Sequence, residues 1–475
     1  MKIIRSITLS MLTVFLFCFA AQAFEVPEHS DEWLSRKQPN TTDSTAANNS
    51  DSDPYYTAIG AYQNVPNFTA WKEKFGFADF TTITILGVEI RVPILFNSPK
   101  VSAKYFNQLD LGIGREMHCS KFNQGRGVAC YVSNYGELPL STGVTPELER
   151  ETLAAMHEFT NRGDTVAMTY DLARENGYRV QFYIYNTKGG KSNNEAPLQN
   201  DIKLDSEGAK ASPGLCLSCH GGTYETTNNI VTGASFLPFD PSLFGYEDDG
   251  EIQQGRQEAA FKKINSYVLA TNPTPAIKKL ITGLYRGIDQ TDTEDDIYSN
   301  GSLSNANADY VPEGWAGHED KYRNVAQKYC LMCHMAIEKP FQDLTFQTSA
   351  NFYENFFNGC RSKEMPHAEV PYNDFWESGV GAENCFDVVK TAWLDRDDPR
   401  DTGDYETLNS FINEGQNICN EPVAIECRTR DGHITSSEAG EVYSCTPNIG
   451  GVCKKSDQAD RRCLDYEVRF QCRVD

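Results

Sequence analysis

The sequence has few basic side chains and no long apolar run beyond its N-terminus. Lys and Arg number 43 against 66 Asp and Glu in 475 residues, which gives a net charge of −23. Nucleic-acid binding relies on Lys and Arg to neutralise phosphates, so this balance argues against a nucleic-acid partner. After residue 23, no stretch approaches the roughly 18 apolar residues that a membrane span requires, and we expect none.

The N-terminus has the three-part layout of a secretory signal peptide. Lys2 and Arg5 precede an apolar run over residues 7–20, and Ala21-Gln22-Ala23 follows as a small-residue cleavage site. We predict a signal peptide over residues 1–23, cleaved after Ala23. This segment carries two basic and no acidic residues, so the mature net charge is near −25. We expect export to the periplasm or the extracellular space.

Two Cys-x-x-Cys-His motifs occur at residues 216–220 and 330–334. This spacing is typical of c-type haem, because two thiols three positions apart each form a thioether to one porphyrin while the next imidazole ligates the iron. The motifs predict two haem c groups. The predicted attachment sites are Cys216, Cys219, Cys330 and Cys333, and the predicted proximal iron ligands are His220 and His334.

Zinc or a redox dithiol is the alternative for these cysteines, since Cys-x-x-Cys supports both. A thioredoxin-like site does not need the following His, and tetrahedral zinc needs ligand clusters that converge. Of the 15 cysteines, one lies in the signal segment and four in the motifs, which leaves ten. That even number predicts five disulfides in an oxidising compartment, with Cys119 bonded to Cys130 and Cys360 to Cys385.

The distal ligands decide whether each iron position is closed or open to small molecules. Met365 and His367 follow the second motif and are the candidates for its iron, with Met365 favoured because a Met-Pro pair resembles the distal loop of single-haem cytochromes c. For the first motif we favour His118, beside the predicted Cys119–Cys130 bridge. The remaining candidates for the first motif are His157, Met117 and Met168.

Local patterns divide the chain into a multidomain α+β protein. Alternating or β-branched runs predict strands, and Thr145 followed by Pro146 predicts a helix start. The predicted strands cover 81–96, 128–132 and 178–186, and the predicted helices 145–159, 251–270 and 322–337. The predicted domains are a signal peptide (1–23), a flexible leader (24–54), a β-rich α+β module (55–204), a mainly α-helical cytochrome c-like dihaem region (205–387) and a small disulfide-rich β domain (388–475).

The C-terminal stretch carries a series of spaced motifs between Lys390 and Cys472. It resembles the WxxW, or CysD, domain of gel-forming mucins and cartilage intermediate layer protein. Lys390 stands where that family has its first Trp, so only Trp393 of the pair is retained, and C-mannosylation of Trp is in doubt. The motifs that carry the resemblance are residues 393–399, 403–407, 425–428, 451–453, 456–458 and 463–469.

The resemblance implies a structural calcium ion and association with mucin or matrix. Carboxylate oxygens in loop-forming sequence suit calcium, although a solvated acidic loop has the same composition. The candidate calcium ligands are Asp395, Asp397, Asp404 and Glu406. Six cysteines of this stretch are expected to pair among themselves, without a fixed connectivity. They are Cys419, Cys427, Cys445, Cys453, Cys463 and Cys472.

These features predict a secreted dihaem cytochrome that carries electrons between redox partners with basic docking surfaces, joined to a C-terminal adhesion or localisation module. The first alternative is a dihaem peroxidase or oxidase with one open haem site. The second is an extracellular glycan- or matrix-binding protein with redox haems. The sequence leaves enzymatic activity undecided and favours a non-enzymatic carrier.

Overall fold

The computed structural model describes most of the chain beyond residue 50 and a few short stretches before it. All structural statements below concern these residues. They are 22–24, 26–28, 30, 33–34, 51–77, 80–85, 88–93, 100–140, 144–175, 178–188, 196–286, 296–298, 301–339, 342–385, 388–420, 422, 424–434 and 436–473.

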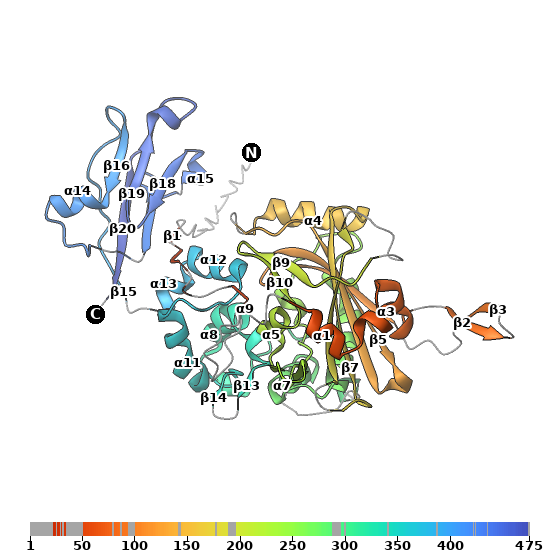
Figure 1. Cartoon of the computed structure of the whole chain (residues 1–475). Coiled ribbons are helices and arrows are strands. Elements are labelled where there is room, and N and C mark those ends of the chain that lie inside the picture. The colour runs from red at the N-terminus through yellow and green to blue at the C-terminus, as the bar shows by residue number, and fades with distance from the viewer. Residues whose placement is uncertain are drawn as a thin grey trace, which may run out of the picture. The chain divides into compact units, whose positions relative to one another are not determined.

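The chain forms two compact units. The larger contains residues 27–375, and the smaller contains residues 376–475 with the N-terminal strand β1. The predicted boundary between residues 204 and 205 falls inside the larger unit. At the centre of that unit is a five-stranded antiparallel sheet in the order β4-β5-β6-β7-β8 (Figure 1). Its strands are β4 (Val101–Asn107), β5 (Ile113–Phe122), β6 (Gly127–Tyr135), β7 (Arg162–Asp171) and β8 (Val180–Tyr185).

The two faces of this sheet differ because side chains alternate along a strand. One face carries His118 and Tyr131, and it is covered by α3 through Phe68 and Trp71 and by α4 through Met156. The opposite face packs toward α5 and α6. Across strands β5 to β8, this second face presents the paired rows Met117, Val132, Val166 and Ile184, and Cys119, Cys130, Met168 and Phe182.

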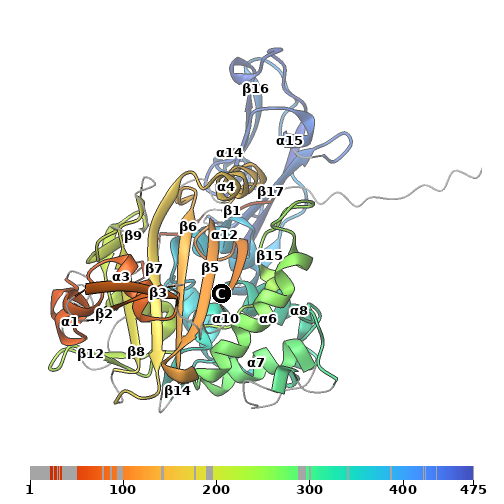
Figure 2. The same cartoon turned by 90° about the vertical axis from the view of Figure 1, so that its right-hand side faces the viewer.

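Short helices and hairpins surround the sheet (Figure 2). The helices are α1 (Asp53–Ala58), α2 (Ala61–Asn64), α3 (Phe68–Lys74), α4 (Pro146–Glu158), α5 (Gly214–His220), α6 (Gln254–Ala270), α7 (Pro275–Arg286), α8 (Glu319–Lys321), α9 (Gln327–Tyr329), α10 (Leu331–His334), α11 (Ser349–Arg361) and α12 (Glu369–Glu377). The hairpins are β2 (Phe80–Ile85) with β3 (Val88–Pro93), β9 (Asp201–Asp205) with β10 (Gly208–Ala211), β11 (Thr223–Glu225) with β12 (Ile230–Thr232), and β13 (Glu338–Lys339) with β14 (Gln342–Asp343).

Elements with strong local signals lie where the sequence predicts them. Helix α4 begins after Thr145, whose hydroxyl accepts a hydrogen bond from the Leu148 N–H at 3.2 Å. Helix α6 and the β2–β3 hairpin also confirm the predicted elements. The predicted helix over 322–337 is interrupted: a π-helical turn (Tyr322–Ala326) precedes α9 and α10. A mainly helical cytochrome c-like region over 205–387 is not found, since three hairpins lie wholly or partly within it.

The predicted flexible leader contains residues that pack into the larger unit. Leu34 is 4% exposed and belongs to a core cluster with Ile184 and Leu215. Trp33 is 9% exposed, with its ring edge-on to Tyr372 at 5.1 Å between centroids. The composition of residues 24–54 did not predict these contacts, because two apolar side chains in a polar stretch leave no periodic signal.

We expect Trp33→Ala to destabilise the larger unit by about 3–5 kcal/mol, the usual cost of deleting a buried large aromatic side chain. Tyr62→Ala serves as the control, because Tyr62 is 37% exposed. The measurement is the denaturant midpoint of the full-length protein, monitored by far-UV circular dichroism so that the signal does not depend on the deleted tryptophan. Equal midpoints for the two variants would show that Trp33 contributes no packing energy.

The smaller unit is built from two antiparallel sheets. β1 contains the predicted cleavage site after Ala23, whereas residues 1–21 of the predicted signal peptide lie outside the described chain. Helices α13 (Val380–Cys385), α14 (Leu408–Asn413) and α15 (Ser436–Ala439) accompany the sheets. One sheet has the order β1 (Gln22–Phe24), β17 (Ala424–Thr429), β20 (Tyr466–Arg473), β15 (Val388–Lys390), and the other β16 (Gly403–Thr407), β19 (Gly450–Lys454), β18 (Tyr443–Thr446).

Disulfides hold the smaller unit together, as a small core requires. The six cysteines of the tail pair among themselves, as Cys419–Cys472, Cys427–Cys445 and Cys453–Cys463. The predicted Cys119–Cys130 bridge joins β5 to β6 in the larger unit. Cys360 and Cys385 are also disulfide-bonded. Within the described residues, no helix is both long and apolar enough to cross a membrane.

Candidate functional site

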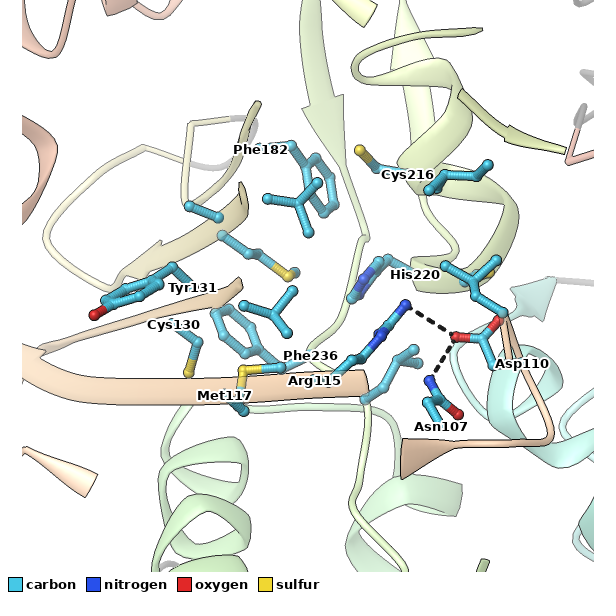
Figure 3. Close-up of a pocket in the computed structure, with 18 of the residues that line it drawn as sticks. Asn107, Asp110, Arg115, Met117, Cys130, Tyr131, Phe182, Cys216, His220 and Phe236 are labelled. Carbon is cyan, nitrogen blue, oxygen red and sulfur yellow. Dashed lines mark hydrogen bonds and ion pairs between the residues drawn. The ribbon is translucent and has the colours of Figure 1, made fainter. Parts of the chain in front are cut away.

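A cavity of about 200 Å³ lies between α5 and one face of the central sheet (Figure 3). Most of its walls are apolar. Helix α5 contributes Cys216, Cys219 and His220 of the first motif, and the sheet contributes residues of the rows described above. The lining residues include Leu34, Met117, Val132, Val166, Met168, Phe182, Ile184, Leu215, Phe236, Phe239 and Met332.

The first motif occupies the last turns of α5. Its His220 ring is held by a 2.9 Å hydrogen bond between Nδ1 and the Ser235 carbonyl, which leaves the lone pair on Nε2. Burial lowers the pKa of His220, so the neutral ring that can ligate a metal is favoured. Gly221 ends the helix with φ +65°, where a Cβ would lie 2.0 Å from the Ala336 carbonyl oxygen. The first motif therefore packs directly against the segment that follows the second.

The second motif has the same local arrangement. Cys330 precedes α10, and the His334 Nδ1 lies 2.9 Å from the Leu344 carbonyl. The His334 ring stacks on Phe346 at 4.2 Å. Each motif thus has an imidazole oriented by one backbone carbonyl, the arrangement in which Nε2 is available to a metal.

The four motif cysteines are thiols, whereas the other ten cysteines outside the signal segment are disulfide-bonded. Burial raises the pKa of Cys216 and of Cys330 to about 12. A hydrogen bond with Cys219, followed by burial, raises the pKa of Cys333. In the described chain, no three of these thiols lie within metal-binding reach of one another, since the acidic group described below is the one cluster of that kind. Cys219 and Cys333 nevertheless contact each other, so the two motifs lie side by side.

The predicted distal ligand His118 does not line the cavity. Its ring stacks on Tyr131 at 4.5 Å, and its Nε2 lies 3.5 Å from Glu116 on the face of the sheet away from α5, although Tyr131 itself also borders the cavity. The next residue back, Met117, lines the cavity because neighbouring side chains on a strand point to opposite faces. Met168 lines it as well. His157 pairs with Glu247 at 2.6 Å and is also outside the cavity.

The candidates near the second motif lie in the segment between α11 and α12. Met365 packs close to Gly359, where a Cβ would lie 3.1 Å from the Met365 Cγ, and the His367 carbonyl accepts a hydrogen bond from the Leu34 N–H. A second cavity of about 30 Å³ is lined by Met332 and Met335. Neither Met365 nor His367 lines either cavity. Their role as iron ligands stays a prediction.

A separate acidic cluster occupies the smaller unit. Asp397, Asp404 and Glu406 place one carboxylate oxygen each within 4.8 Å of one another. Asp404 and Glu406 are two positions apart on β16, so both carboxylates point to the same side of the strand. Both side chains are fully buried. Asp404 accepts from the Tyr466 N–H at 3.0 Å with Oδ2, whereas its buried Oδ1 has no partner among the described residues.

The pKa values of this cluster are displaced upward. Burial, followed by the charges of Asp397, Asp465 and Asp395, raises the pKa of Asp404 to about 8. Burial, with Asp404 and Asp397 nearby, raises the pKa of Glu406 to about 9. The fourth predicted ligand, Asp395, is instead ion-paired with Arg430 and does not join the cluster.

The Trp position of the motif follows β15 and contacts side chains of β17 and β20. The Trp393 ring contacts two guanidinium groups, Arg428 at 3.8 Å and Arg469 at 4.7 Å from the ring centre. Lys390, which replaces the first Trp, donates to Glu426 at 2.8 Å. These two cation–π contacts stabilise the position of the ring.

Comparison with known proteins places this unit. Residues 390–472 match the Mucin-2 protein WxxW repeating region. This unit therefore contains a segment similar to a mucin-type WxxW domain, and residues 390–472 are called the WxxW domain below. Human Mucin-5AC is 33% identical over 111 residues, which are 22% of this chain and 2% of that protein. Human Cartilage intermediate layer protein 2 is 36% identical over 85 residues, 17% of this chain and 7% of that protein. Human Mucin-5B is 34% identical over 88 residues, 17% of this chain and 2% of that protein.

These relatives contradict the function predicted from the sequence. The predicted electron-carrying dihaem cytochrome and the peroxidase or oxidase alternative are wrong, because the relatives are mucins and cartilage intermediate layer proteins. The predicted cytochrome and electron-transfer roles are therefore wrong. The redox role in the second alternative finds no support among these relatives, whereas its matrix context agrees with them. The match begins at residue 390, so the motifs at 216–220 and 330–334 lie outside it, and their cofactor stays a prediction.

The relatives agree with the predicted compartment. The protein is exported, as its mucin and cartilage intermediate layer protein relatives and its disulfides indicate. The relatives also indicate an extracellular matrix or glycan context, whereas redox partners find no support among them. The chain spans 2–7% of the length of these three relatives, and the likeness concerns the WxxW domain alone.

Proposed function

We propose that this exported protein attaches to an extracellular glycoprotein or matrix layer through its WxxW domain. The match over residues 390–472 carries the proposal. The three disulfides of the domain support it, because they keep a small β-rich module folded outside the cell. The unit of residues 27–375 would then be held at that layer.

An exposed apolar pair on the WxxW domain is the candidate contact surface. Val442 is 62% exposed and Leu464 45% exposed. The Glu441 carboxylate accepts a hydrogen bond from the Leu464 N–H at 3.0 Å, so the two segments that carry these side chains meet there. We propose that these two exposed side chains contribute apolar contacts to the glycoprotein or matrix layer.

Retention of the full-length protein on immobilised mucin tests this proposal. We expect Val442→Ser combined with Leu464→Ser to weaken retention by about tenfold or more, the effect of losing a central apolar contact. Val389→Ser is the matched control, since Val389 is 59% exposed on β15 of the same unit. Absence of retention for the unmodified protein, or equal loss in the control, would contradict the proposal.

We also propose that Asp397, Asp404 and Glu406 bind calcium in this domain. Three carboxylates within 4.8 Å form a hard-oxygen donor set, and the unpartnered Asp404 Oδ1 supports the presence of a cation there. Without a cation, the two buried carboxylates would hold protons at neutral pH, because their pKa values are raised to about 8 and about 9. The ion would therefore join β16 to Asp397.

For the larger unit we propose that Cys216 with Cys219, and Cys330 with Cys333, attach two haem c groups. Thiols that stay out of disulfides in an exported chain support covalent use of their sulfurs. The apolar cavity beside Cys216 and Cys219 and the oriented His220 and His334 rings support a flat ligand with an iron at its centre. When bound, haem supplies an iron that these imidazoles would ligate.

A further inference from the structure

The cavity beside α5 has one polar end. The Asp110 carboxylate lies 3.1 Å from the Asn107 side-chain nitrogen and 3.4 Å from Arg115 Nη2 (Figure 3). All three residues line the cavity. Apart from the residues of the first motif and three tyrosines, the rest of the described wall is apolar. At this end of the cavity a ligand would meet charged and amide groups together.

Arg115 is not fully used by these partners. Asp110 takes one terminal nitrogen of the guanidinium, while Nε is buried and has no partner among the described residues. The Asn107 Oδ1 is also buried and has no hydrogen-bond partner among the described residues. The Arg115 side chain is only 17% exposed, so little solvent reaches the group. A buried donor in this state favours a ligand that supplies the missing acceptor.

The geometry of a guanidinium selects the kind of acceptor. The Nε and Nη donors on one edge form a rigid planar fork that matches the two oxygens of a carboxylate. Arg115 lies on β5 with its side chain on the cavity face, and Figure 3 shows its guanidinium directed toward His220 on the opposite wall. An anionic edge of a bound molecule would therefore meet Arg115 while its flat apolar part fills the space between α5 and the sheet.

We infer that Arg115, positioned by Asp110, binds a carboxylate of a flat, largely apolar ligand in this cavity. The inference rests on the proposed cofactor, whose porphyrin carries two carboxylates. Arg115 is then a ligand-binding residue that the Cys-x-x-Cys-His motif does not identify. It fixes which edge of the ligand lies beside β4 and β5.

Reversible porphyrin binding tests the inference. Full-length protein with Cys216→Ala and Cys219→Ala is titrated with protoporphyrin IX and with its dimethyl ester, followed by porphyrin fluorescence. We expect the diacid to bind at least tenfold more tightly than the ester. Arg115→Gln should remove this preference and Arg115→Lys should keep part of it, because Lys retains the charge without the fork. Arg126→Gln is the control, since Arg126 is exposed near the end of the same sheet.

The ester comparison with Arg115 intact does not depend on how the Arg115 variants fold. Equal affinities for the diacid and the ester would overturn the role of Arg115. Intact-mass measurement of the unmodified protein separates this result from failure of the proposed cofactor. Haem attached at Cys216 and Cys219 with no ester discrimination would refute the Arg115 assignment alone, whereas no attached haem and no porphyrin binding would refute both.

Discussion

Removal of calcium with EGTA is expected to lower the unfolding temperature of the WxxW domain in the full-length protein. A ligand that binds only the folded state at about 100 times its Kd stabilises by about 2.7 kcal/mol. For a unit of about 100 residues this corresponds to about 10–20 °C. Differential scanning calorimetry of the calcium-loaded and calcium-free protein measures the shift.

Asp404→Asn combined with Glu406→Gln should abolish the calcium response. These changes keep the shape of both side chains and remove the two buried charges that the ion would balance. Asp457→Asn is the matched control, because Asp457 is an exposed acid of the same unit. A calcium shift of unchanged size in the double variant would place the ion elsewhere.

The calcium effect should grow with pH. The pKa values of Asp404 and Glu406 are raised to about 8 and about 9, so the folded domain without calcium holds protons that the unfolded chain releases near pH 4. Stability without calcium is therefore full below about pH 4 and falls as the pH rises toward 8–9. Calcium replaces these protons. We expect a small calcium shift at pH 5 and a large one at pH 8, and a shift independent of pH would contradict this coupling.

The sequence predicted the helices and strands that are determined by neighbouring residues. Thr145 and Pro146 fix the start of α4, and β-branched residues on both sides of a turn give the β2–β3 hairpin. Cys119 and Cys130 were paired from spacing, and they face each other on β5 and β6. The tail was predicted from its spaced motifs, and the match over residues 390–472 confirms that resemblance.

Features that depend on distant parts of the chain were not predicted. Choosing between His118 and Met117 as the residue near the first motif required knowing which face of β5 meets α5. A shift of one residue along the strand moves a side chain to the other face. Asp395 is not part of the acidic cluster, because it forms an ion pair with Arg430, 35 positions later in the sequence. Trp33 and Leu34 pack against segments far along the chain. The predicted function of the whole protein was wrong for a different reason. The Cys-x-x-Cys-His motifs indicate attachment of a group, but they do not indicate where the protein acts.

Replacing Cys216 and Cys219 with Ala is expected to remove one covalently attached haem from the mature protein and to leave the other. Each thioether needs a motif thiol, and no other described cysteine outside the two motifs is a thiol. The reciprocal change, Cys330→Ala with Cys333→Ala, should remove the second haem, and the two variants serve as controls for each other. Intact mass after export from a host that attaches haem c measures the loss.

The same mass spectra distinguish haem attachment from the thiol alternatives. A bound zinc ion would leave the protein on denaturation with a chelator and yield four thiols that react with an alkylating reagent, whereas thioethers do not react. A dithiol site would give a mass two hydrogens lighter on oxidation of each motif. An unmodified protein with four reactive thiols would refute haem attachment, and the cavity beside α5 would then belong to a ligand that is not covalently held.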